Sequence, residues 1–160
     1  MSTPQKPAYI SDLEAVYGAP SQSGFGSAVF LDQAASAADL EKKALERYKY
    51  FVGKGWTSER ESGWMSAWKK VYERPSGAKG DIVSELKAIT DADARNSIPM
   101  ILDNISDPAA GQKALSAAYD DPSVSDLKVY NLGDGGAMSG VLVAGRRSNG
   151  EAALLVFLLD

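Results

Sequence analysis

The sequence predicts an α+β fold, with about five helices packed on a C-terminal three- or four-stranded antiparallel meander. Apolar residues recur at helical spacing between residues 36 and 119, whereas alternating, β-type runs begin after residue 126. An Asn149-Gly150 pair separates the last two runs and is typical of a hairpin turn. We expect residues 1–35 to form a partly ordered N-terminal segment and residues 36–160 a single α+β domain.

A short helix is expected over 11–17, inside the N-terminal segment. Ser11 can cap it with Glu14 three residues later, and Gly18 followed by Pro20 ends it. A loop rich in Ser and Gly comes next, after which residues 28–31 could add a fourth strand to the sheet.

The next two helices are expected to form an antiparallel hairpin. The first covers 37–52, with Ser36 as its cap and Gly53 at its end. The second begins near Ser58 and runs to Pro75, because its large aromatic residues follow helical spacing. Only a few residues separate the two helices, which favours antiparallel neighbours.

Three shorter helices follow. Asp81 can cap the first of them. The second is predicted over 98–105, with Ser97 as cap and Pro99 in its first turn. The third starts at Ser106 with a proline in its first turn, and runs to Tyr119 before an Asp-Asp-Pro sequence.

Residues 127–132, 138–147 and 151–159 are the predicted strands of the meander. The last run is apolar on both of its alternating faces, which indicates a strand covered on both sides. We expect helices on one face of the sheet and a second subunit on the other.

The chain contains no histidine and no cysteine. These absences exclude Ser-His-Asp and Cys-His catalysis, zinc sites built on imidazole or thiolate, and disulfide bonds. No metal or other cofactor is implied, and the sequence assigns no catalytic residue. Enzymatic activity is therefore uncertain, and the balance is against it.

The N-terminus has no apolar region typical of a signal peptide, and the longest apolar run, 152–159, is far shorter than the roughly 20 residues that cross a bilayer. We expect a cytoplasmic protein with no membrane partner.

Charge and aromatic residues coincide in the middle of the chain. Residues 40–80 carry ten basic and five acidic residues, whereas 1–39 and 81–160 are both acidic. The same block holds seven of the chain's 14 aromatic residues, including all three tryptophans. Trp, Tyr and Arg dominate protein interfaces, although the same aromatic residues could simply form core. The candidate contact residues are Trp56, Arg60, Trp64, Trp68, Lys69 and Tyr72.

The leading hypothesis is a non-enzymatic module that binds a protein partner or itself, with a homodimer as one form, through the basic, aromatic-rich helical hairpin. Nucleic acid is an unlikely partner, because the chain has a formal net charge of −4. The alternative is a small-molecule pocket, or a His/Cys-free enzyme of the isomerase or hydrolase type, between helices and sheet. In that reading an aspartate acts as base and a tyrosine as donor. Its candidate residues are Asp103, Tyr130, Asp134 and Arg146.

Overall fold

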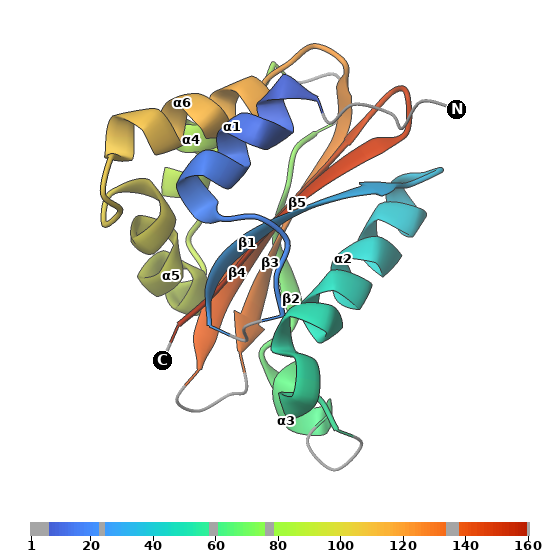
Figure 1. The fold of residues 1–160 in the computed structure, drawn as a ribbon, viewed down its shortest axis with the longest axis vertical. Helices are drawn as coiled ribbons and strands as arrows, with labels where there is room; N and C mark the ends of the chain where they lie inside the picture. The colour runs from blue at the N-terminus through green and yellow to red at the C-terminus, as the bar shows by residue number, and fades with distance from the viewer. Residues whose placement is uncertain (1–6, 23–24, 58–60, 76–78, 134–137, 160) are drawn as a thin grey trace.

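The computed structural model describes residues 7–22, 25–57, 61–75, 79–133 and 138–159. These residues form six α-helices, one 3-10 turn and a five-stranded antiparallel sheet, so the predicted α+β class is confirmed (Figure 1). The sheet has at least one strand more than predicted. In chain order the elements are α1 (Ala8–Tyr17), β1 (Gly26–Gln33), α2 (Ala37–Val52), η1 (Gly53–Gly55), α3 (Glu61–Ser66), β2 (Lys69–Glu73), α4 (Ile82–Lys87), α5 (Ala92–Leu102), α6 (Pro108–Tyr119), β3 (Val124–Gly133), β4 (Ser139–Arg147) and β5 (Glu151–Leu159).

The strand order is β1-β5-β4-β3-β2. The predicted meander of the last three strands is therefore present, with Val143 opposite both Val129 and Leu155. β1, the predicted fourth strand, pairs with β5 and places Ala28 opposite Val156. β5 thus lies inside the sheet, between β1 and β4.

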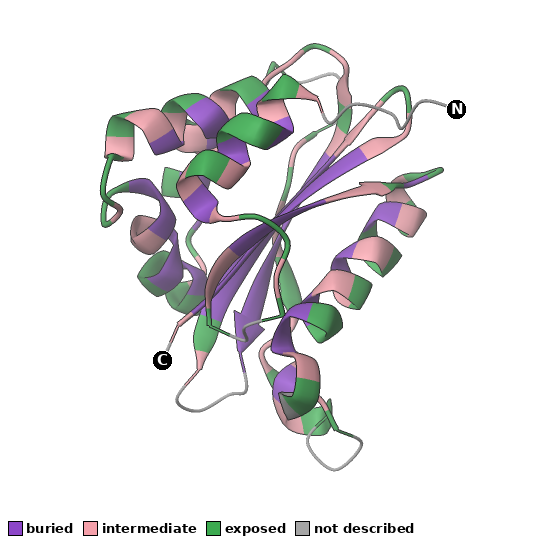
Figure 2. Ribbon diagram, viewed as in Figure 1, coloured by how far each residue is buried: buried purple, intermediate pink, exposed green. Residues whose placement is uncertain are grey.

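Helices of the same chain cover both faces of the sheet, as the buried residues of Figure 2 show. Val129, Val143 and Leu155 pack on one face beneath α1, α4, α5 and α6. The alternating residues Tyr130 and Val156 pack on the other face, beneath α2 and α3. The expectation that a second subunit covers this face was wrong, because the apolar side of α2 already fills it.

The helix predicted between Ser58 and Pro75 is present only in its first part, as α3, and the prediction that it continues to Pro75 was wrong. In the described residues, α3 ends at Ser66, and the chain then continues as the edge strand β2. β2 pairs with β3, and its irregular register places Lys69 opposite Asn131 and Tyr72 opposite Val129. Pairing with a strand almost 60 residues later satisfies this backbone, and local spacing of aromatic residues does not reveal such a partner.

The helix predicted over 98–105 begins earlier. Asp91 caps α5, and its carboxylate accepts a hydrogen bond from the Ala94 amide at 3.0 Å. Pro99 therefore lies inside the helix rather than in its first turn. The missing proline N–H removes one helical hydrogen bond, yet burial of Ile98 and Ile101 against the core holds the segment helical.

α4 starts after Asp81 as predicted, and α6 starts after Asp107, at Pro108, two residues later than expected. Within the described ranges no helix combines the length and apolar character needed to span a bilayer. The same ranges contain no group of three or more potential metal-ligating acidic side chains.

Candidate functional site

Five side chains form an aromatic cluster on the α2 face of the sheet: Tyr48, Trp56, Trp64, Trp68 and Tyr130. The Trp68 ring is stacked on Tyr130, with centroids 4.6 Å apart and planes 6° apart, and it is also parallel to Tyr48 at 5.6 Å. Trp56 meets the edge of Tyr48 at 5.0 Å. Such ring pairs stabilise a fold by about 0.5–1.5 kcal/mol each beyond the area that they bury.

Most of this cluster is core. Tyr48 and Tyr130 are fully buried and Trp64 is 6% exposed, whereas Trp56 and Trp68 are half-buried and pack against the same core. The structure therefore assigns the largest part of the aromatic signal in residues 40–80 to folding. Only Trp56 and Trp68 among the three tryptophans keep a partly accessible ring.

The other predicted contact residues lie elsewhere. Lys69, on β2, places its Nζ 2.6 Å from Oδ2 of Asp91. Tyr72 packs against the core on the opposite sheet face from the tryptophans. Arg60 lies outside the described residues. The predicted contact set is thus not one surface.

The predicted pocket residues are not brought together either. The Tyr130 hydroxyl donates to Oε1 of Glu41 at 3.1 Å on the α2 face, and burial raises the pKa of this tyrosine. Asp103, at the end of α5, lines a separate cavity of about 230 Å³ on the other face. Arg146 Nε donates to Asp126 Oδ2 at 2.8 Å. Asp134 lies outside the described residues.

Tyr72, one of the predicted contact residues, belongs to a buried ionic network beside the edge strand β2. The guanidinium of Arg74, whose side chain is 7% exposed, donates to both carboxylate oxygens of Glu85, and Tyr72 donates to Glu85 Oε2 at 2.5 Å. Burial raises the Tyr72 pKa, and with the hydrogen bond to Glu85 brings it to about 12. Arg74 also bonds the Tyr119 carbonyl, so this network joins β2 to α4 and α6.

Sequence reasoning missed a site on the outer side of α2. Tyr50 is 43% exposed, one of the two exposed large hydrophobic residues in the described part of the chain. Its ring is held edge-on against Phe30 at 5.8 Å, and the Arg47 guanidinium lies 5.7 Å from the Tyr50 centroid. The sequence did indicate this site. Tyr50 does not lie on the apolar side of α2, which is formed by Leu40, Ala44, Tyr48 and Phe51.

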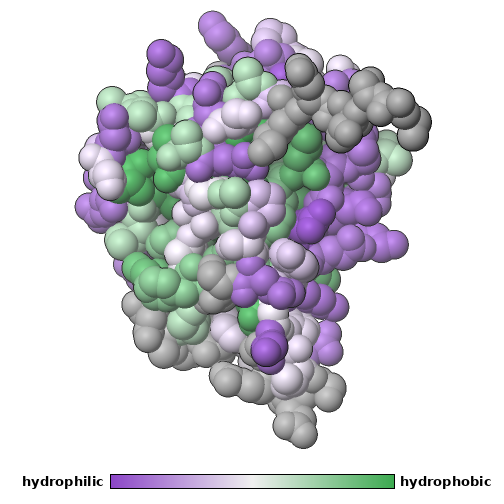
Figure 3. All heavy atoms as spheres, viewed as in Figure 1, coloured by the Kyte–Doolittle hydropathy of each residue, from purple (hydrophilic) through white to green (hydrophobic). Residues whose placement is uncertain are grey.

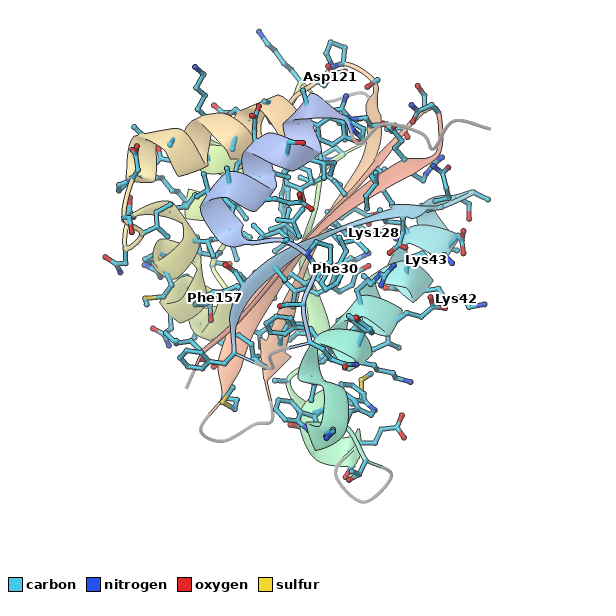
Figure 4. The ribbon with its side chains drawn as sticks, viewed as in Figure 1. Phe30, Lys42, Lys43, Asp121, Lys128 and Phe157 are labelled. Atoms are coloured by element: carbon cyan, nitrogen blue, oxygen red, sulfur yellow. The ribbon has the colours of Figure 1, made fainter. Side chains whose placement is uncertain are left out.

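Arg47 fixes this site. Its Nε and Nη2 donate to the two carboxylate oxygens of Asp32 at 2.7 and 2.6 Å. That hydrogen bonding raises the Arg47 pKa although burial opposes it. The guanidinium is also 5.0 Å from the Phe30 centroid, and Phe30 lies between β1 and α2 (Figure 4). Because the guanidinium donates to both oxygens of one carboxylate, Arg47 is held in one position, and the Tyr50 ring beside it is held as well.

α2 also carries lysines that precede Tyr50 in the sequence. Lys43 lies one turn before Arg47, and the Lys49 ammonium is 5.6 Å from the Trp56 ring. We call Lys43, Arg47, Lys49 and Tyr50 the Tyr50 surface. Figure 3 shows that hydrophilic residues dominate the exterior over α2, and in Figure 4 Lys42 extends outward from this helix.

Fold and site together define a small α+β domain whose antiparallel sheet carries helices on both faces. Comparison of the chain with protein-family models, with curated proteins and with solved structures finds no match.

Proposed function

We propose that the protein is a non-enzymatic binding domain that recognises an acidic segment of a partner protein through the Tyr50 surface. The observation that carries this proposal is Tyr50 itself, an exposed aromatic ring held in place by Phe30 and Arg47. A ring that is already ordered loses little conformational entropy on binding, which is why rigid aromatic anchors dominate interfaces.

Charge favours an acidic partner. Lys42 and Lys49 on α2 and Lys54 in the turn after it are exposed. Among the described residues, the ion pairs of the α2 lysines are long, 3.8 Å from Lys43 to Glu46 and 3.7 Å from Lys49 to Glu61. Exposed pairs of this kind contribute about 0–1 kcal/mol, so partner carboxylates can replace them.

A second copy of the chain fits this surface less well. The helices of one chain already cover both sheet faces, so folding does not require a dimer. A cytoplasmic location stays a prediction.

The test is site-specific photocrosslinking. A photoreactive phenylalanine at position 50 is compared with the same residue at position 113. Position 113 lies on α6, which covers the sheet face opposite α2. We expect position 50 to capture a protein that position 113 does not. The identified partner, once purified, should bind Tyr50→Ala about 30-fold more weakly than wild type, corresponding to about 2 kcal/mol.

Lys113→Ala is the matched control and should leave the partner's affinity unchanged. Equal capture at the two positions would contradict the proposal, and so would a purified partner that binds Tyr50→Ala as tightly as wild type. Capture of a second copy of the chain would replace the heterologous partner by self-association.

A further inference from the structure

The sheet has two edge strands, β1 and β2, and they differ in how well they are protected against further pairing. Folded proteins protect sheet edges with lysine, proline, irregular register or short strands. β2 is five residues long, begins with Lys69 and Lys70, and has a register shift after Lys70. β1 is eight residues long, pairs with β5 in unbroken register, and contains no lysine, arginine or proline. β1 is therefore the edge that can accept another strand.

The outward-facing backbone groups of β1 belong to its odd-numbered residues. The Val29 amide donates to the Gly18 carbonyl at 3.0 Å, and Gly18 lies outside the sheet, so this amide points away from β5. Amides alternate in direction along a strand, and those of Leu31 and Gln33 therefore face the same edge. In the described part of the chain neither amide has a backbone partner on that side. The edge is thus occupied by the chain after α1 as far as Val29, and is open beyond it.

The Tyr50 surface lies along this open part of the edge. Arg47 donates to Asp32 of β1, and the Tyr50 ring packs against Phe30, so both residues of α2 contact the second half of β1. Figure 1 shows this half of β1 running beside α2. A strand added next to Leu31 would direct every second side chain toward the sheet face that carries α2 and its lysines.

Charge decides between two occupants, a second copy paired through its own β1 and an acidic segment in extended conformation. Two β1 strands paired about a twofold axis would form one continuous sheet, with the α2 helices of both copies on the same face. The exposed Lys42 and Lys49 of each copy would then lie on the same side of the joint, and like charges across an interface destabilise it. An acidic segment instead brings opposite charge to these lysines.

We propose, building on the proposed function, that the acidic partner segment binds as an added strand on the open edge of β1. The amides of Leu31 and Gln33 donate to carbonyls of the segment, and the Leu31 carbonyl accepts from one of its amides. Acidic side chains at every second position face the lysines of α2, and the same side of the segment contacts Tyr50. In this mode of recognition, main-chain hydrogen bonds supply affinity and alternate side chains supply specificity.

The test is the solvent exchange of backbone amides, measured by NMR on the full chain. The probe is a short synthetic peptide that alternates glutamate with threonine, and its control alternates lysine with threonine. We expect the acidic peptide at saturation to slow exchange of the Leu31 and Gln33 amides at least about tenfold. The Phe30 amide, which points to β5, should not change, and the lysine peptide should protect neither edge amide.

Leu31→Pro removes the outward amide without removing a hydrogen bond to β5, which is the position at which edge strands tolerate proline. It should weaken binding of the acidic peptide at least about tenfold. Leu31→Val retains the amide and is the matched control, with an affinity close to that of wild type. If Leu31→Pro does not fold, the exchange measurement on the wild-type chain decides.

Binding of the acidic peptide with unchanged exchange at Leu31 and Gln33 overturns the added strand, while the Tyr50 surface would still be the binding site. Absence of protection at saturating acidic peptide, or absence of binding, also overturns it. Protection of both amides that persists at full affinity in Tyr50→Ala would support the added strand and contradict the role of Tyr50. A dimer in light scattering, with both amides protected before any peptide is added, assigns the edge to a second copy and overturns the acidic segment.

Discussion

The hydroxyl of Tyr48 and the backbone of Gly133 are joined in both directions. The Gly133 amide donates to the tyrosine oxygen at 3.0 Å, and that oxygen lies 3.1 Å from the Gly133 carbonyl. The hydroxyl also reaches the Trp64 carbonyl at 2.8 Å. One buried phenol thus ties α2 to α3 and to the end of β3.

Replacing Tyr48 with phenylalanine should lower the free energy of unfolding by about 1–3 kcal/mol, because the Gly133 amide stays buried with no acceptor. Urea denaturation measures the loss. Tyr50→Phe, which removes a hydroxyl from an exposed ring, should change stability by less than about 0.5 kcal/mol. Equal effects of the two substitutions would refute the role given to the Tyr48 hydroxyl.

The Arg74–Glu85 pair should make stability depend on pH. Burial raises the Glu85 pKa, but hydrogen bonds from Arg74 and Tyr72 outweigh it and hold the pKa below its usual value. A carboxyl with a lowered folded-state pKa stabilises the fold above its unfolded pKa of about 4.3, and this contribution disappears as the pH falls through the folded-state value.

Glu85→Gln should therefore cost about 3 kcal/mol at pH 7, and the gap between wild type and variant should narrow steadily below about pH 4. Unfolding curves from pH 3 to 7 measure this gap. Glu46→Gln, at an exposed pair with Lys43, is the control and should show a gap below about 0.5 kcal/mol at every pH. A Glu85→Gln gap that does not vary with pH contradicts the assignment.

Gly140 lies on β4 at a point where β5 leaves no room for a side chain. A methyl group there would collide with the Phe157 carbonyl, which belongs to the backbone and cannot rotate away. Gly140→Ala should therefore destabilise the protein by about 3 kcal/mol. Thermal unfolding checks this, with Ser139→Ala at the exposed neighbouring position as control. A fully stable Gly140→Ala variant would show that these strands are not paired as described.

Local signals predicted much of the fold. α2 occupies the predicted residues, because the Ser36 hydroxyl accepts from the Asp39 amide and Gly53, with a φ of 65°, ends the helix. The Asn149-Gly150 turn predicted the β4–β5 hairpin for the same local reason. Elements that depend on distant partners were missed. The residue spacing in β2 is typical of a helix, and only its pairing with β3 makes this segment a strand. The sheet face that α2 covers depends on where the other helices lie.

The site could be predicted less well. The sequence pointed to residues 40–80, but burial divides that block, and the side on which each aromatic residue lies follows from the position of α2 on the sheet. Tyr50 could have been selected from its position off the apolar side of α2. The burial of Asn131 could not be predicted, because it depends on pairing with β2 and on a hydrogen bond to the Ala67 carbonyl, both far away along the chain.

The aromatic residues of the segment 40–80 divide into core, at Trp64, and a contact surface, at Tyr50. The free energies of unfolding of Trp64→Ala and Tyr50→Ala, measured side by side in urea, test this division most directly. We predict a loss of about 3–5 kcal/mol for the buried tryptophan and below about 1 kcal/mol for the exposed tyrosine. A Tyr50→Ala loss as large as that of Trp64→Ala would contradict the claim, because Tyr50 would then belong to the core.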